Sequence, residues 1–468
     1  MSRPILIRIT IAFASFFLLL IIFRVFQNPQ IYNATLGKIS SNYSHIGGLN
    51  QYEIRSVKKP FEKITPANSY RWDALLFKSV KDSSYAGSSV HYKERLDYYP
   101  LYPLLLKITG IDSPLVFLLS YILFIAGLIL LSNLLGGKDS SAYFMFTIAL
   151  LFPPVVSFYL PYAESLFLFA FAVSLWGMLH KKYGVFFIGA FAFAMTRPSV
   201  LIYFIALLVA DLRAFIVHRN FPLFIRGLAL KLAPFLSGFL TVTLIQYTYS
   251  GSFTAYFDAQ VFWPAESGFF NTINDWSIEG FGMNSFAIFF LALPAAVYCI
   301  RWIIKAFRET PQHLQPSFIK ADPAVLKDYI FNTALLFIAG NLLYTFLTSG
   351  NSLNGFSRYS MAVPFFYIVL FMLPEKMATL SLQKKTIAFL TSLAGLILFY
   401  SLVVYGGNRF RFSYTGLYLS IALLVFVLYE PYIPAKRKMI FCLLMALPCL
   451  IWHAYLFNVY LSDGWIFT

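Results

Sequence analysis

The stretch GVFFIGAFAFAMTRPSVLIYFIALLVADL, residues 184–212, decides how the chain is arranged. A membrane-spanning helix needs about 20 apolar residues, so this stretch is too long for one helix and short for two. Thr196-Arg197-Pro198 interrupts it in the middle, and proline interrupts a spanning helix where protein walls satisfy the freed backbone groups. We therefore predict two short helices that meet at Arg197.

The composition places the chain among the integral membrane proteins. Of its 468 residues, 59% are hydrophobic and 12% are charged, whereas a soluble domain averages about 25% charged residues. Together with the broken stretch, apolar runs of helix length predict an all-α integral membrane protein with about 13 (about 11–13) spanning helices. The runs lie at roughly 5–26, 114–135, 141–160, 163–180, 231–250, 284–306, 328–348, 359–373, 386–405, 413–430 and 439–459.

The basic residues support this arrangement, because loops on the cytoplasmic side of a membrane carry an excess of lysine and arginine. The pattern requires residues 184–212 to cross the membrane twice. It also explains most of the formal net charge of +16, so the charge indicates membrane lipids rather than nucleic acid as partners. With the N-terminus in the cytoplasm, cations gather in the segments 136–140, 181–183, 213–231, 301–327, 376–385 and 436–438.

The same arrangement predicts one membrane domain over residues 1–468, with no soluble C-terminal domain. Residues 27–99 form the first outer loop, where we expect amphipathic helices. The C-terminus also lies outside. We expect the inner membrane of a bacterium, where the outer side is periplasmic or extracellular; in a eukaryote it would be lumenal.

Five charged residues stand out on the predicted outer side. Asp73 lies in an amphipathic stretch of the first outer loop, and Asp97 follows in the same loop. Glu164 lies at an outer turn, Arg197 at the break, and Arg358 at the start of an outer helix. A charge at membrane depth costs about 2.5–3.5 kcal/mol, so such residues are candidates for function. Their structural alternatives are interfacial ion pairing or anchoring, a helix-end charge and a snorkelling cation.

An outer acid beside outer arginines suits the transfer of a sugar from a polyprenyl phosphate. The phosphate leaves without being protonated, so one carboxylate suffices as the base that takes the proton of the acceptor hydroxyl. Arginine holds phosphate by charge-assisted and often bidentate hydrogen bonds. Glycoside hydrolysis has a poorer leaving group and calls for two carboxylates. The sequence shows no cysteine or histidine pair at metal-ligand spacing.

Four stretches, in this order, resemble the PIG-V-like family of the GT-C membrane glycosyltransferases, which comprises the second mannosyltransferase of glycosylphosphatidylinositol assembly and its prokaryotic relatives. They are Trp72-Asp73-Ala74 with Phe77, Tyr98-Tyr-Pro-Leu-Tyr-Pro103, Phe152-Pro153-Pro154 with Pro161-Tyr-Ala-Glu-Ser-Leu-Phe167, and Thr196-Arg-Pro-Ser-Val-Leu201. Arg358-Tyr359 with Pro364 resembles a late Arg-Tyr-Pro element more weakly. The chain departs from the family at Leu76, where histidine is usual, and at Pro198-Ser199, where Asn-Gly is usual.

The resemblance implies a GT-C fold, in which a many-helix bundle carries an outer site with a lateral opening for the lipid donor. It implies that Asp73 is the catalytic acid, and we expect Arg197 and Arg358 to bind the donor phosphate. Aromatic residues beside such a site can stack on sugar faces. Some enzymes of this class use a divalent metal, but we expect no metal and no cofactor here. The expected substrate-binding residues are Trp72, Asp97, Tyr162, Glu164 and Tyr359.

The leading hypothesis is an inverting glycosyltransferase, a mannosyltransferase in particular, that moves a sugar from a polyprenyl phosphate to a hydroxyl of a glycan, glycolipid or protein. A transporter or flippase of a lipid-linked saccharide is the alternative. It would place polar groups near the midplane, often in repeated broken helices, whereas the sequence has one break and no evident repeat. A non-catalytic partner subunit of a glycosyltransferase is the third hypothesis.

Overall fold

The computed structural model describes residues 3–40, 60–86, 94–136, 140–260, 283–308, 323–348, 353, 355–402 and 412–463. These residues form helices and connecting turns, and no strand occurs among them. Within this part of the chain, nine helices are long and apolar enough to cross a membrane, and three shorter apolar helices accompany them. The predicted all-helical, multi-pass membrane protein is therefore confirmed at this level.

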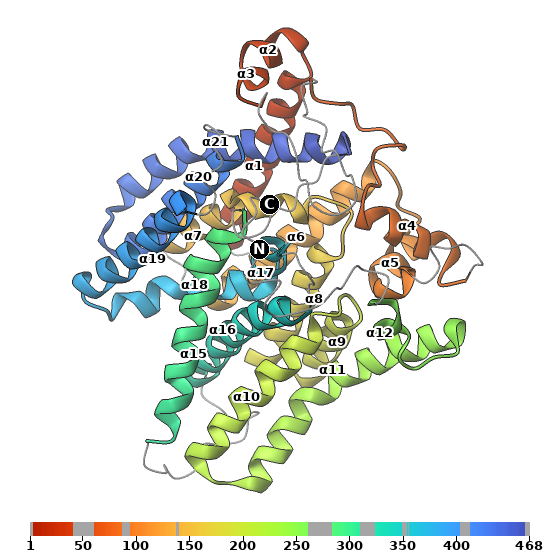
Figure 1. Ribbon diagram of the computed structural model, residues 1–468, viewed down its shortest axis with the longest axis vertical. Coiled ribbons are helices and arrows are strands. Elements are labelled where there is room, and N and C mark those ends of the chain that lie inside the picture. The colour runs from red at the N-terminus through yellow and green to blue at the C-terminus, as the bar shows by residue number, and fades with distance from the viewer. Residues whose placement is uncertain are drawn as a thin grey trace.

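The spanning-length helices come from all parts of the chain (Figure 1). They are α1 (Arg3–Phe26), α6 (Leu115–Leu135), α10 (Val200–His218), α11 (Phe221–Ser250), the continuous run of α14 (Met283–Phe286), the π-helix η5 (Ala287–Ala292) and α15 (Leu293–Ala306), α16 (Pro323–Thr348), α19 (Leu382–Leu402), α20 (Phe412–Tyr429) and α21 (Ala435–Leu461). The shorter apolar helices are α7 (Ser140–Leu151), α8 (Glu164–Leu179) and α9 (Tyr183–Ala194).

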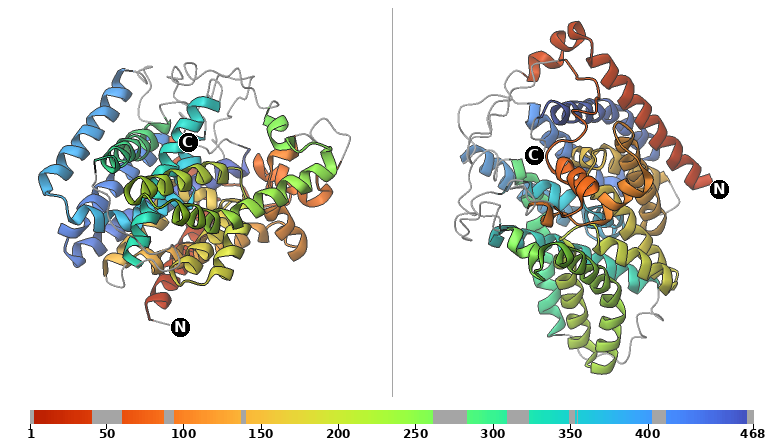
Figure 2. Two further views of the ribbon diagram at one scale, coloured as in Figure 1. Left: turned by 90° about the horizontal axis from the view of Figure 1, so that it is seen from below. Right: turned by 90° about the vertical axis from the view of Figure 1, so that its right-hand side faces the viewer.

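Short helices connect or cover these. They are α2 (Pro29–Ala34), α3 (Leu36–Ser40), α4 (Asp73–Ser83), η2 (Glu94–Asp97), α5 (Leu101–Thr109), η3 (Pro153–Phe158), α12 (Ala255–Gln260), α17 (Phe356–Met361), α18 (Pro364–Ala378) and η7 (Glu430–Tyr432). Two of them, α4 and α5, pack on each other at one edge of the molecule beside α12, which contacts η2 (Figure 1). The helix α1 lies on the outside, against α21 and α7 (Figure 2).

The predicted break in residues 184–212 is present. The helix α9 ends at Ala194 and α10 begins at Val200, so the chain turns at the Thr196-Arg197-Pro198 interruption. The turn is tied to the start of α5, because Leu101 N–H donates to the Met195 carbonyl at 3.2 Å. The break therefore brings Arg197 close to the segment that follows the first predicted outer loop.

Two other predicted helices are interrupted by proline. The prediction of one helix over 141–160 is wrong in its second half, because α7 ends at Leu151 and the 3-10 helix η3 follows. The consecutive Pro153 and Pro154 lack the N–H groups that a continuing α-helix needs. Similarly, the run 359–373 divides at Pro364, which starts α18.

The loop predicted at residues 213–231 is also wrong in extent. The helix α10 continues to His218 and α11 begins at Phe221, so Lys231 lies inside a helix. The side chain of Asn220 caps α11, since it accepts a hydrogen bond from Leu223 N–H at 3.0 Å. A hydrophobic window in the sequence marks the apolar middle of a helix, and the capped polar ends extend beyond it.

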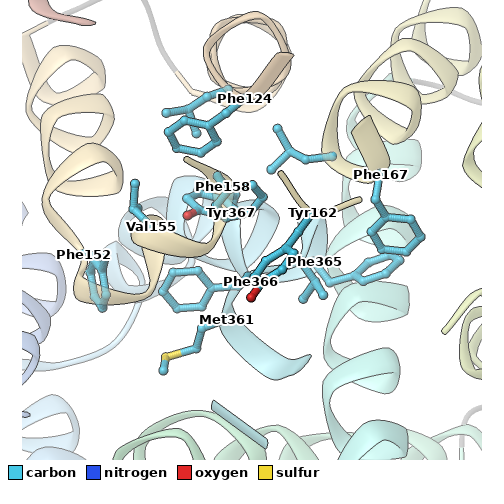
Figure 3. Packing of buried hydrophobic residues seen from close by; sticks show 14 of the residues in the cluster. Phe124, Phe152, Val155, Phe158, Tyr162, Phe167, Met361, Phe365, Phe366 and Tyr367 are labelled. Atoms are coloured by element: carbon cyan, nitrogen blue, oxygen red, sulfur yellow. The ribbon is translucent and has the colours of Figure 1, made fainter. Parts of the chain in front are cut away.

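An aromatic core lies where η3, α8 and α18 meet (Figure 3). Phe158 stacks on Phe124 with ring centroids 4.6 Å apart, and Phe152 meets Phe366 edge-on at 5.1 Å. Tyr162, just before α8, lies among these rings within the cluster (Figure 3). Aromatic pairs of this kind contribute about 0.5–1.5 kcal/mol beyond their buried area. They give the segments that carry the site a rigid support.

Candidate active site

Four charged side chains from separate parts of the chain meet in one ion-paired cluster, called here the charge network: Asp73, Glu164, Arg197 and Arg358. Arg358 donates from Nε to Glu164 Oε1 at 2.5 Å and from Nη1 to Asp73 Oδ2 at 2.6 Å. Arg197 Nη1 lies 3.1 Å from the same Glu164 oxygen. The structure thus brings together four of the five charged residues that the sequence singled out.

Asp73 is the first residue of α4 and the accessible acid of the network. Its side chain is 26% exposed, and its Oδ1 accepts a hydrogen bond from the Tyr98 hydroxyl at 3.0 Å. An acid in the first turn also interacts favourably with the helix dipole. One carboxylate oxygen is therefore held by a neutral donor and the other by Arg358, and the group still faces solvent.

The turns that precede Asp73 are held in place by hydrogen bonds to α21. The Tyr460 hydroxyl of α21 donates to the Ser69 carbonyl at 2.9 Å and accepts from Arg71 N–H at 3.0 Å. Trp72 follows with φ +52° and ψ −130°. This backbone conformation costs a bulky residue about 1–3 kcal/mol, and residues strained in this way are frequent at functional sites. The turn at Trp72 directs the chain into α4, with Asp73 as its first residue.

Glu164 is the first residue of α8 and is 1% exposed. A helix-end charge explains its position, but a buried carboxylate is costly unless it is paired. The pairing comes from two guanidinium groups, because Arg358 and Arg197 both approach Oε1. Glu164 is therefore the shared anchor of the two arginines.

Arg197 stands in the break between α9 and α10, with a side chain 11% exposed. Its guanidinium carbon lies 5.8 Å from the ring centre of Phe167 and 5.7 Å from that of Tyr359. Its Nη1 forms an ion pair with Glu164 but no hydrogen bond of normal geometry to any residue in the described part of the chain. Arg197 thus combines a buried charge with donor capacity left for a further anion.

Two predicted substrate-binding tyrosines line the network. The Arg358 guanidinium carbon lies 4.4 Å from the ring centre of Tyr162, which is fully buried. It lies 5.9 Å from that of Tyr359, which is 42% exposed. Tyr162 therefore supports the arginine from inside, whereas Tyr359 presents a ring face and hydroxyl to an incoming ligand.

The protonation states of the network follow from its charges. Burial alone would lower the pKa of Arg358, but the carboxylates of Glu164 and Asp73 raise it well above its ordinary value. Burial and the Asp73 charge raise the pKa of Tyr98 well above the ordinary value for tyrosine. Arg358 consequently stays charged, and Tyr98 stays a hydrogen-bond donor to Asp73.

Asp97 occupies a different environment. It is the last residue of η2. Burial chiefly raises the pKa of Tyr99, and the charge of Asp97 adds to the rise. None of the ion pairs or hydrogen bonds described for Asp73 or Glu164 involves it. The neighbouring Tyr98, which sequence reasoning quoted only as part of a motif, is the residue of this segment that reaches Asp73.

No group of three or more His, Cys, Asp or Glu side chains that could hold a metal ion occurs in the described part of the chain. Comparison with known proteins adds no assignment: no family model matches the chain, and no curated protein or solved structure matches it significantly. The candidate site therefore rests on its own geometry, which is a balanced network of two acids and two arginines with exposed members.

Proposed function

We propose that this protein is an inverting glycosyltransferase of the GT-C class that transfers a hexose, mannose in particular, from a polyprenyl phosphate to an acceptor hydroxyl on the outer side of the membrane. The observation that carries the proposal is the partly exposed Asp73 carboxylate in one network with Arg197, which keeps a hydrogen-bond donor for a further anion. A base for a hydroxyl and a cation for a phosphate are the two groups that this transfer requires.

We assign roles to the two arginines from the exposure of their side chains and from the carboxylates that they already bind. Arg358 is 5% exposed and bonded to two carboxylates, so we assign it the orientation of Asp73 and Glu164. Arg197 retains donor capacity, so we assign it the donor phosphate. This division also separates the base from the leaving group, as an inverting displacement requires. Tyr359 and Trp72 flank the acceptor and sugar.

In the proposed step, the acceptor oxygen forms a bond to the anomeric carbon while its proton moves to an Asp73 oxygen. The bond between the anomeric carbon and the phosphate oxygen breaks, and its electron pair leaves with the polyprenyl phosphate. Arg197 stabilises the charge that develops on this phosphate. Such preorganised electrostatic stabilisation is usually the largest single contribution to catalysis.

The position of the network favours an enzyme over a transporter. None of its four residues lies within one of the nine spanning-length helices of the described chain. They stand instead at the starts of α4 and α8, in the break before α10 and in the short helix α17. A transporter would place such groups near the membrane midplane, inside its spanning helices.

The experiment is transfer from radiolabelled undecaprenyl-phosphate mannose, and from the corresponding glucose donor, by purified protein with membrane-derived acceptors. Asp73→Asn should lower the transfer rate by about 100-fold or more, because a general base contributes about 10²–10⁴-fold. Its matched control is Asp82→Asn in the same helix, since Asp82 is 46% exposed and forms its ion pair with Lys78 one turn away, not with the charge network. Full activity of Asp73→Asn would show that the assigned role is wrong.

A further inference from the structure

The short helix α17 carries Arg358 and is six residues long. Isolated helices shorter than about 12–15 residues are marginal in water, so its conformation must come from tertiary contacts. It starts after Gly355, which has φ +78°, and a Cβ at Gly355 would lie 3.1 Å from the Tyr359 ring. It ends before Pro364, which begins α18. Both ends are thus fixed by residues with special backbone requirements.

Two buried asparagines from other helices hold α17 in place by hydrogen bonds. Asn284 of α14 accepts from Ser357 N–H at 2.7 Å and donates from Nδ2 to the Leu353 carbonyl at 2.8 Å. Asn341 of α16 donates to Ser360 Oγ at 3.0 Å. Asn284 is fully buried. Its two bonds hold the backbone on the N-terminal side of Arg358, directly next to the residue.

The place of Asn284 has a local cause further along its own helix. Pro294 follows the π-helical turns of η5, where it lacks an N–H and its ring clashes with the carbonyl four residues earlier. A π-helix accommodates this clash within a continuous helix and is frequent at functional sites. A π-helical turn holds more residues than an α-helical turn, so η5 changes the register between α14 and α15. Asn284 lies on the side of α14 that contacts α17.

We propose that Asn284 is a positioning residue: it holds α17 so that the Arg358 guanidinium reaches Asp73 and Glu164 together. The proposal rests on the proposed function for the chemical role of Asp73, but the geometry it concerns is independent of that role. A guanidinium that bonds two carboxylates at 2.5 and 2.6 Å needs a backbone held to well under 1 Å, because charge-assisted hydrogen bonds are short and directional.

The first test measures the coupling between Asp73 and Arg358 by a double-mutant cycle of Asp73→Asn and Arg358→Gln, read as thermal stability in detergent. The cycle is repeated in the Asn284→Ala protein. We expect the coupling to fall to about half or less there, because the pair loses its fixed geometry. Asn284→Ser is the milder variant, since its hydroxyl stays neutral at this fully buried position but is too short to bond both Ser357 N–H and the Leu353 carbonyl.

The control is Asn133→Ala. Asn133 lies near the C-terminal end of α6 and accepts a hydrogen bond from Arg8. Asn133→Ala should therefore lower the stability and leave the Asp73–Arg358 coupling unchanged. An unchanged Asp73–Arg358 coupling in both Asn284 variants would overturn the inference, whether or not the protein transfers sugar.

The second test separates positioning from donor binding. With undecaprenyl-phosphate mannose as donor, Asn284→Ser should lower kcat about tenfold and change the affinity for undecaprenyl phosphate less than about twofold. In an Arg358→Gln background it should have no further effect on kcat. If the coupling falls in the first test and the wild-type protein transfers no sugar, the positioning role stands and the proposed function fails. An equal loss of kcat in both backgrounds would contradict the positioning role.

Discussion

The charge network differs from a second set of buried charges, the Asp211–Lys231 pair. This pair joins α10 to α11, with side chains 7% and 8% exposed. Lys231 also donates to the Tyr329 hydroxyl at 3.1 Å, with its ammonium 4.4 Å from the centre of that ring. The pair holds one acid and one base on neighbouring helices, and both side chains are buried.

The network, by contrast, joins four elements and keeps accessible members. Asp73 is 26% exposed and Arg197 11% exposed. Glu164 is shared by two arginines and Arg358 by two carboxylates, so the charges are not matched one to one. Burial of charge alone therefore does not distinguish the candidate site from a structural ion pair. The candidate site differs in that it holds Asp73 by hydrogen bonds and leaves its side chain partly exposed.

The largest effect, on stability, is expected from breaking the Asp211–Lys231 pair. Lys231→Met leaves the Asp211 carboxylate buried without its cation, and breaking a buried ion pair costs about 3–5 kcal/mol. The double variant Lys231→Met with Asp211→Leu should recover most of this loss, because apolar replacement of a whole buried pair is often neutral. Thermal unfolding in detergent micelles measures both. A double variant less stable than the single one would show that the pair is more than a matched structural contact.

The second largest effect, on the transfer rate, is expected from breaking the charge network at Glu164. Glu164→Gln removes the charge that anchors both arginines, and a hydrogen bond to a charged group contributes about 1.5–3 kcal/mol, so transfer should fall about 10–100-fold. The matched change in the other set, Asp211→Asn, should leave the rate per folded molecule within about threefold. Initial rates normalised to folded protein give the comparison. Equal activity losses in the two variants would remove the distinction between the two sets.

The sequence predicted one of these regions better than the other. Asp73, Glu164, Arg197 and Arg358 were identified because each interrupts an apolar pattern or ends one, and charge alternation put them on one side. Lys231 was predicted in a loop, because a single cation at the edge of an apolar run looks the same in a loop and in a capped helix. Only the packing of α10 against α11 shows that it is buried.

The helical architecture was also predictable, since apolar runs and prolines report directly on helix length and breaks. The contacts inside the site were not. The sequence could not show that Arg358 bonds both carboxylates, because that depends on where α17 lies relative to α4 and α8. Nor could the sequence show that Asn284 bonds the backbone at Ser357 and Leu353, since a single asparagine in an apolar run belongs to no recognisable sequence pattern.

The smallest expected effect concerns an exposed ionic contact near the site, which extends the comparison to a third kind of pair. Asp112 accepts from the Tyr70 hydroxyl at 2.6 Å and from Lys81 at 3.0 Å, and its side chain is 49% exposed. Partial burial would raise its pKa, but the hydrogen bonds from Tyr70, Lys81 and Ser113 N–H lower the pKa to about 2 from an ordinary 3.8.

Because the folded-state pKa is the lower one, the contact stabilises the protein fully above pH about 4, and this contribution is lost as the pH falls toward 2. Both Tyr70 and Lys81 flank Asp73 in the chain, so the contact helps to anchor α4. Melting temperatures measured from pH 5 to pH 3 should fall more steeply for the wild-type protein than for Asp112→Asn, which has no proton to gain. Parallel curves would show that this half-exposed contact, unlike the buried network beside it, contributes nothing measurable to the anchoring of α4.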